Sequence, residues 1–135
     1  MSAVAYARAY QTQSILTASP GQLVLMMYDG VLRFLSQARA HLAEPETDTR
    51  RIAQVNTALL RAQAIIAELQ ANLDFTAGGE FANNLDRLYD YHLRRLLEAN
   101  IKKDDAIVAE VERLVRELRD GWAEMLRTSD AAQVA

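Results

Sequence analysis

Between positions 52 and 73, apolar residues recur at alternating spacings of three and four, and no other part of the sequence is so regular. In an α-helix these spacings place the residues in one line along a single face, as in helices that pack into bundles. Thr47 or Asp48 can cap such a helix. The pattern therefore predicts a helix whose apolar seam packs against other helices. The seam consists of Ile52, Val55, Leu59, Ala62, Ile66, Leu69 and Leu73.

An earlier helix is predicted from Ser19 to Leu42, because its start has the residues of a capping box. Ser19 can cap the helix, Pro20 suits its first turn, and Gln22 lies three residues after the cap. The apolar residues of this helix form two stripes instead of one. Such a helix is either the buried centre of a domain or has a second face that binds a partner. The stripes are Leu23, Met27, Gly30, Phe34 and Ala38, and Leu25, Tyr28, Leu32 and Leu35.

Two further helices are predicted after the seam. The glycine pair within 74–79 predicts a turn, so that a third helix is expected from about Glu80 to Asn100. Asp104 can cap a fourth helix, which is expected to end near Arg127. Four helices with short connections predict an all-α fold, an antiparallel four-helix bundle.

The bundle is expected to span residues 19–128. Residues 1–18 are interpreted as a mobile N-terminal arm, in which Tyr6 and Tyr10 can lie on one side of a short helical turn. Residues 129–135 have no apolar pattern and are expected to fray.

The composition argues against several classes of function. The chain has 135 residues, no cysteine and a net charge of −3, which disfavours disulfides, thiolate metal sites and nucleic-acid binding. The longest apolar run, Leu23 to Tyr28, is too short for a membrane span, which takes about 20 residues. Residues 1–13 lack the apolar core of a signal peptide. We therefore predict a cytoplasmic domain with no membrane insertion.

A local basic cluster is interpreted as a solvated helix end; it consists of Arg94, Arg95, Lys102 and Lys103.

The motifs that would hold catalytic or metal-binding residues are missing. The Glu-x-x-His motif of di-iron bundles is absent at both His41 and His92, and no phosphate-binding glycine loop occurs. We therefore predict no enzyme, no catalytic residue, no metal site and no cofactor. His92 leaves one alternative, because histidine phosphotransfer domains are also small helical bundles with a histidine near basic residues. The default interpretation places His92 at the edge of the core, bonded to a neighbour.

The helices carry more apolar surface than one seam can bury, and such a surplus marks a partner site when it is exposed. It predicts either self-association or a groove that accepts an amphipathic helix from another protein. Met26, Met27, Tyr28 and Tyr89 suit an adaptable groove, because thioethers repack and tyrosine keeps a polar group at a wet edge. Their spacing alone favours the core, so both assignments stay open.

A series of short motifs follows in order along nearly the whole chain. They are Tyr10-Gln11, Thr17-Ala18-Ser19-Pro20, the stretch 23–30, Arg33-Phe34-Leu35, Arg61-Ala62-Gln63, Ile65-Ile66, Glu68-Leu69, Leu73-Asp74, Gly78-Gly79-Glu80, Asn84-Leu85, Leu88-Tyr89-Asp90-Tyr91, Ala99-Asn100, and Glu117-Leu118-Arg119-Asp120 before Trp122. In this order they resemble the FliS family of flagellin-specific export chaperones. The sequence departs from the family pattern at Gly21, Phe81 and His92.

The resemblance implies a cytoplasmic chaperone that binds the disordered C-terminal segment of flagellin, prevents premature polymerisation and delivers flagellin to the type III export apparatus. The export gate is a further partner that this role allows. The runner-up is a self-associating helical scaffold, and weak self-association is compatible with either role.

The resemblance also implies a site. Trp122 is expected to anchor the bundle core, and Asp29 to bond to the arm or to a neighbouring helix. The arm residues Tyr6, Tyr10 and Ile15 would lie on the groove. The flagellin-binding residues would be Leu23, Met26, Met27, Tyr28, Ile65, Leu69, Leu85, Tyr89 and Leu93.

Overall fold

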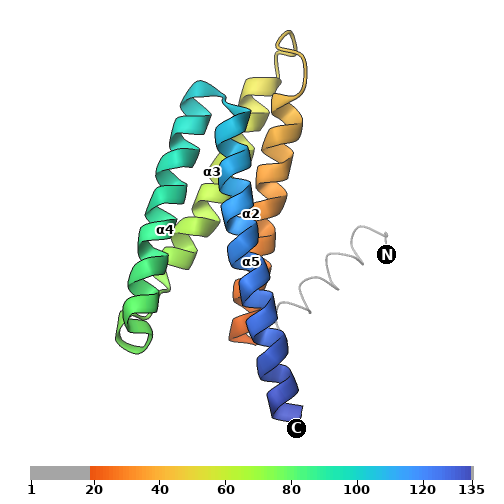
Figure 1. The fold of residues 1–135 in the computed structure, drawn as a ribbon. Helices are drawn as coiled ribbons and strands as arrows, with labels where there is room; N and C mark the ends of the chain where they lie inside the picture. Colours follow the sequence, from red (N-terminus) through yellow and green to blue (C-terminus); the bar gives the residue numbers. More distant parts are fainter. Residues whose placement is uncertain (1–18, 135) are drawn as a thin grey trace, which may run out of the picture.

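Helices of alternating direction make up the described part of the chain (Figure 1). The computed structural model describes the backbone of residues 19–134 and the side chains of residues 19–129. Within this range the four helices confirm the predicted antiparallel all-α fold. The predicted arm, with Tyr6, Tyr10 and Ile15, lies outside the described residues. The helices are α2 (Pro20–Leu42), α3 (Arg51–Ala71), α4 (Phe75–Lys102) and α5 (Asp105–Val134).

Each of these helices packs against two neighbours. Helices α2 and α4 both contact α3 and α5, so that α2 and α4 lie across a diagonal of the bundle. The helices are close together at the end that carries the α4–α5 connection, and α4 diverges from α2 and α5 toward the other end (Figure 1). The two ends of the bundle therefore differ in how tightly they are packed.

The predicted capping residues begin two of the helices. Ser19 accepts a hydrogen bond from the backbone N–H of Gln22, whose side chain accepts one in return, which completes the capping box of α2. Asp104 accepts a hydrogen bond from the N–H of Ala106 at the start of α5. The predicted cap of α3, Thr47 or Asp48, is wrong. The N-cap residue is Arg50, which makes no side-chain capping bond. Asp48 instead accepts a hydrogen bond from the N–H of Arg50, and so stabilises the turn before the helix.

Helix α4 begins earlier than predicted. It starts at Phe75 instead of Glu80, because Asp74 accepts hydrogen bonds from two backbone N–H groups of the first turn. Gly79 then interrupts the helix with φ 51° and ψ −126°, a conformation that glycine adopts without a Cβ clash. The glycine pair therefore bends the chain inside α4, where the sequence predicted a turn before the helix.

Helix α5 is longer than predicted. It continues to Val134, although the sequence predicted an end near Arg127 and a frayed tail over 129–135. The Thr128 hydroxyl donates to the carbonyl of Glu124 over 3.0 Å, and no glycine or proline follows to end the helix. Despite the length of α5, neither it nor any other helix within residues 19–134 is apolar enough to cross a membrane.

The core is densest in the half of the bundle that contains the α4–α5 connection. Leu35, Leu59 and Leu96 come from three different helices and are completely buried, and the valines of α5 close the fourth side. The predicted seam of α3 is confirmed from Val55 to Leu69. Ile52, in the first turn of α3, is 60 % exposed and does not belong to the core.

Candidate functional site

An apolar groove opens at the end of the bundle where α4 diverges from α2. It has a volume of about 680 Å³, and all four described helices contribute to its lining. Most of the lining side chains are apolar, which is typical of a surface that binds another apolar group. We define the apolar groove by Pro20, Leu23, Val24, Met27, Tyr28, Glu68, Leu69, Asn72, Leu73, Asp74, Ala77, Gly78, Phe81, Ala82, Leu85, Tyr89 and Trp122.

Two smaller hollows share lining residues with the apolar groove. One, of about 230 Å³, runs between α4 and α5 and reaches Leu118 and Met125. The other, of about 430 Å³, lies between α2 and α3 and includes Met26 and Ile65. Because α2 lines all three, its N-terminal half is the element around which the apolar surface is arranged. This explains why the sequence of α2 has two apolar stripes.

Large apolar side chains at this end of the bundle are open to solvent. Phe81 lines the groove and is 58 % exposed, and Met125 in the adjoining hollow is 44 % exposed. Within residues 19–129 nothing covers these side chains. An apolar hollow with exposed aromatic and thioether groups beside it is the kind of surface that a partner protein buries.

Helix α5 is attached to the start of α2 by contacts that position one wall of the groove. Trp122 Nε1 donates to the carbonyl of Gly21 over 2.8 Å. A Cβ at Gly21 would lie 2.6 Å from a methyl carbon of Leu126, so glycine at this position allows α5 to approach. Arg119 Nε donates to Asp29 Oδ1 over 2.8 Å, which confirms the expected bond from Asp29 to a neighbouring helix. Trp122 is half-buried, and it both packs on the core, as expected, and lines the groove.

A pair of tyrosine hydroxyls forms the floor of the groove. The hydroxyl oxygens of Tyr28 and Tyr89 are 2.6 Å apart, across the α2–α4 diagonal, and each residue is only 2 % exposed. Burial raises the pKa of both phenols. Both hydroxyls therefore remain protonated at neutral pH.

The structure brings eight of the nine predicted binding residues to this end of the bundle. Met26 and Ile65 lie in the hollow between α2 and α3. Leu93 packs half-buried against the core and lines none of the three hollows. The remaining six line the apolar groove: Leu23, Met27, Tyr28, Leu69, Leu85 and Tyr89.

Sequence reasoning missed several groove residues, among them Phe81, a large apolar side chain that is 58 % exposed. It was named as a departure from the family pattern and not as a binding residue, whereas the structure exposes it and buries the neighbouring Ala82. Val24 and Leu73 were not selected as binding residues, and Trp122 was assigned to the core alone. The glycine pair before Phe81 was the available signal, because a bend at Gly79 changes the direction of α4 directly before this residue.

His92 is buried and has no polar partner among the described residues. It is 1 % exposed, and neither ring nitrogen makes a hydrogen bond there. The expectation that it bonds to a neighbour is therefore wrong; its ring instead meets the edges of Tyr89 and Tyr91. Burial lowers the pKa of His92 to about 4. A phosphodonor cannot reach a ring in this position, which argues against the phosphotransfer alternative.

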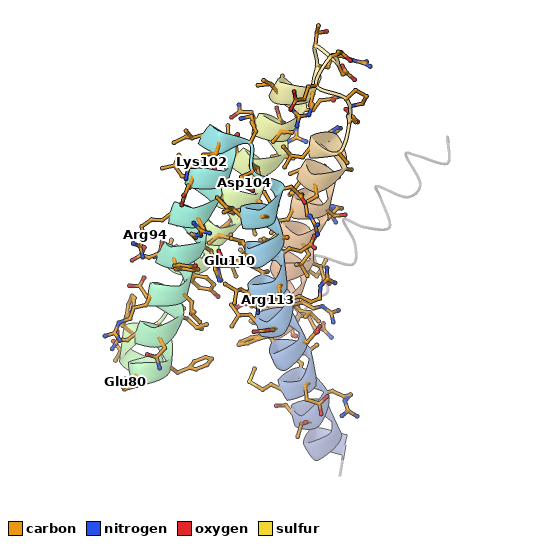
Figure 2. All side chains as sticks on the ribbon, turned by 45° about the horizontal axis from the view of Figure 1, so that its top comes forward. Glu80, Arg94, Lys102, Asp104, Glu110 and Arg113 are labelled. Carbon is orange, nitrogen blue, oxygen red and sulfur yellow. The ribbon has the colours of Figure 1, made fainter. Side chains whose placement is uncertain are left out.

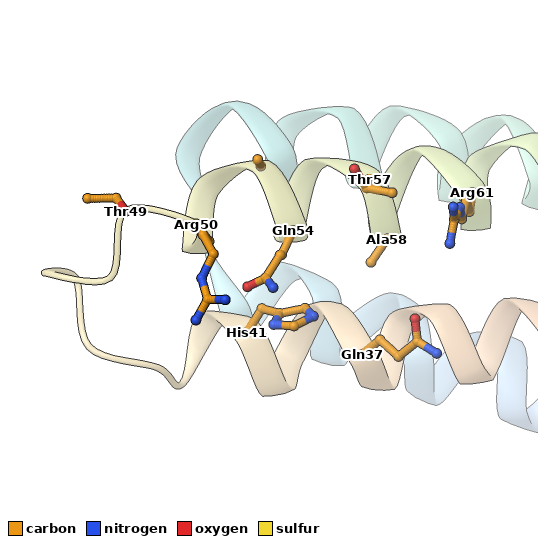
Figure 3. Close-up of a pocket in the computed structure, with 9 residues that line it drawn as sticks. Gln37, His41, Thr49, Arg50, Gln54, Thr57, Ala58 and Arg61 are labelled. Atoms are coloured by element: carbon orange, nitrogen blue, oxygen red, sulfur yellow. The ribbon is translucent and has the colours of Figure 1, made fainter.

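A polar hollow of about 460 Å³ lies between α2 and α3, away from the groove (Figure 3). Gln37, His41, Gln54 and Arg61 are among its lining residues. His41 Nδ1 is already 3.1 Å from Glu44 Oε1. No group of three or more metal-ligating side chains within residues 19–129 could hold a metal ion. We assign no ligand to this hollow.

Two of the four residues in the basic cluster of α4 are paired with carboxylates. Arg95 contacts both Glu98 and Glu110, and Lys102 contacts Glu98. Figure 2 shows Arg94 and Lys102 on the outer side of α4, with Glu110 on α5 facing it. The hydrogen bonds from Lys102 and Arg95 lower the pKa of Glu98. The pairing of Arg95 and Lys102 agrees with a solvated helix end.

Comparison with known proteins gives one family over almost the entire chain. A family model described as "Flagellar protein FliS" matches residues 1–129. The flagellar secretion chaperone FliS of Bacillus subtilis (strain 168) is 38 % identical over 120 residues, which cover 89 % of this chain and 85 % of the relative. FliS of Salmonella typhimurium is 38 % identical over 122 residues, 90 % of this chain and 87 % of the relative. FliS of Escherichia coli (strain K12) is 35 % identical over 130 residues, 96 % of this chain and 92 % of the relative.

Proposed function

This chain belongs to the flagellar protein FliS family, whose compared members are flagellar secretion chaperones, and from that premise we propose that it binds the C-terminal segment of flagellin in the apolar groove. Binding in the cytoplasm would prevent premature polymerisation and deliver flagellin to the flagellar type III export apparatus. The open apolar groove is the observation that carries the proposal.

The groove has the chemistry that an amphipathic helix requires. Such a helix presents apolar side chains at spacings of three and four, which can enter a hollow lined by leucine, methionine and aromatic groups. The thioether of Met27 can repack around side chains of different shape. A flagellin segment that folds on binding loses about 2–5 kcal/mol of the interaction energy to ordering, so the complex can be specific and still release its cargo.

Isothermal titration of the full chain with the C-terminal peptide of the same organism's flagellin tests the proposal. We expect saturable 1:1 binding, a negative heat-capacity change, and a gain of helix by circular dichroism beyond the sum of the two parts. Binding only after deletion of residues 1–13 would indicate that the predicted arm occupies the groove. No binding by either form would contradict the proposal.

Substitutions of two residues with similar exposure test whether the peptide binds in the groove or elsewhere on the surface. Phe81 is 58 % exposed in the groove, and Leu97 is 55 % exposed elsewhere on α4. Phe81→Ala is expected to weaken peptide binding about 5- to 30-fold, because an aromatic anchor at an interface contributes about 1–2 kcal/mol. Leu97→Ala should leave the affinity within about twofold. Equal losses in both variants would remove the groove from the proposal.

The alternative role, a self-associating scaffold, predicts a different species in solution. A scaffold would bury the exposed apolar side chains between copies of the chain, and native mass spectrometry would then show a stable oligomer that does not dissociate when peptide is added. The chaperone role predicts a 1:1 complex with the peptide.

A further inference from the structure

The tyrosine pair on the floor of the groove has one more donor than the bundle uses. Two hydroxyls carry two O–H groups, and the single bond between Tyr28 and Tyr89 uses one of them, whichever residue donates. Neither hydroxyl makes another hydrogen bond with the described residues. The ring of His92 lies beside that of Tyr89, with centroids 6.3 Å apart, but its nitrogens make no hydrogen bond with the described residues. One tyrosine O–H therefore has no acceptor among the residues that the structure describes.

The position of the pair decides where that acceptor can come from. Both tyrosines line the apolar groove, and both are almost completely buried. Water in the open groove can accept the spare O–H in the unbound chain. A segment that fills the groove displaces this water, and leaving a buried donor unpaired is unfavourable. The bound segment has to supply an acceptor at this point or lose affinity.

We propose that the spare hydroxyl of the Tyr28–Tyr89 pair donates a hydrogen bond to a side-chain amide oxygen, from Asn or Gln, on the apolar face of the bound segment. The pair would then fix the register of the segment, because an apolar groove alone permits a helix to shift along it. This inference rests on the proposed function, since it concerns the same groove.

The chemistry of the groove favours an amide over other acceptors. Backbone carbonyls inside a helix already accept hydrogen bonds from the N–H four residues later, so a helical segment offers the groove its side chains. A carboxylate is disfavoured, because burying it in an apolar hollow is costly and the groove already has two acidic lining residues, Glu68 and Asp74. The neutral amide oxygen accepts strongly and avoids both penalties.

A double-mutant cycle between chain and peptide tests the inference. Each Asn and Gln of the flagellin C-terminal peptide is replaced by Leu, and each peptide is titrated into the full wild-type chain and the Y28F/Y89F variant. In the wild type we expect one peptide position at which replacement weakens binding about tenfold. In Y28F/Y89F the same replacement should change the affinity by less than twofold. One single variant, Y28F or Y89F, should keep the tenfold effect, because the hydroxyl that contacts the segment needs no partner to donate.

The controls separate this inference from the proposed function and from misfolding. Replacing both partners of a buried hydrogen bond by apolar groups of the same shape is nearly neutral for folding, so Y28F/Y89F should keep the urea midpoint of the wild type. Y91F is the matched control, because the Tyr91 hydroxyl donates to Glu110 outside the groove, and it should keep the tenfold effect. If the peptides bind and every replacement is additive with Y28F/Y89F, the inference is wrong and the proposed function stands. If the peptide does not bind the wild type, both are wrong.

Discussion

His92 shows how one buried side chain makes the stability of the bundle depend on pH. Its ring is enclosed by the core and has no partner among the described residues, and its pKa falls from an ordinary 6.5 to about 4. Between these values the unfolded chain binds a proton that the folded chain does not. The contribution of neutral His92 to stability is therefore complete above about pH 6.5 and is lost as the pH falls toward 4.

We predict that His92→Leu removes this dependence and stabilises the chain. The substitution eliminates two unpaired buried polar atoms, so the free energy of unfolding at pH 7.5 should rise by about 1–3 kcal/mol. Between pH 6.5 and pH 4.5 the wild type should lose up to about 1.4 kcal/mol per pH unit more than the variant. Urea unfolding at several pH values measures both effects. His41→Gln is the control, since His41 is partly exposed and lies beside Glu44; an equal change of slope in this variant would exclude His92 as the cause.

Among the elements, α4 depends most on a single backbone conformation. Gly79 has φ 51° and ψ −126°, and the bend there carries Phe75–Gly78 into the position where Ala77 and Gly78 line the groove. A residue with a Cβ is strained at these angles. The shape of the groove at this point therefore depends on a backbone conformation that favours glycine.

The prediction for this element compares two glycines with open space around them. A Cβ at Gly79 or at Gly121 would meet no atom within 4 Å, so only the backbone conformation distinguishes the two positions. Gly79→Ala should lower the free energy of unfolding by about 1–3 kcal/mol. Gly121→Ala, in helix α5, should raise it by up to about 1 kcal/mol, because alanine favours a helix over glycine. Urea unfolding checks both values, and a stabilising Gly79→Ala would mean that the bend is not needed.

The whole bundle has one closed end and one open end. At the closed end the four described helices bury a continuous aliphatic core that includes Leu35, Leu59 and Leu96. At the open end the side chains of residues 23–27 in α2 are half-buried, whereas α5 after Leu118 alternates between half-buried and exposed side chains and the first turns of α4 are mostly exposed. Local stability follows buried apolar contact, so the ends should open with different free energies.

Hydrogen exchange measured by mass spectrometry tests this difference. Amides of residues 92–99 in α4 are expected to exchange most slowly, whereas those of residues 75–82 should exchange at least about tenfold faster, since few apolar contacts hold that segment. Adding the flagellin peptide should slow exchange in 75–82 and in the part of α5 around Trp122, and leave 92–99 unchanged. Uniform protection along α4 would contradict the division into two ends.

Much of this fold follows from local sequence. The capping box at Ser19 and Gln22 and the seam from Val55 to Leu69 appear in the structure as predicted, because capping bonds and helical spacing involve residues within one or two turns of each other. The helix boundaries at Phe75 and Val134 were missed, since Asp74 starts a turn before the glycines and no residue after Arg127 forces α5 to end.

The sequence alone determined that the chain is a set of amphipathic helices with surplus apolar surface, because these properties depend on residues close together in the chain. Only the tertiary structure decided which apolar residues line the groove. Tyr28 and Tyr89 are 61 positions apart and meet across a diagonal, and Phe81 is exposed while Ala82 is buried. The divergence of α4 from α2 and α5 creates these differences, and that divergence depends on how all the helices pack together.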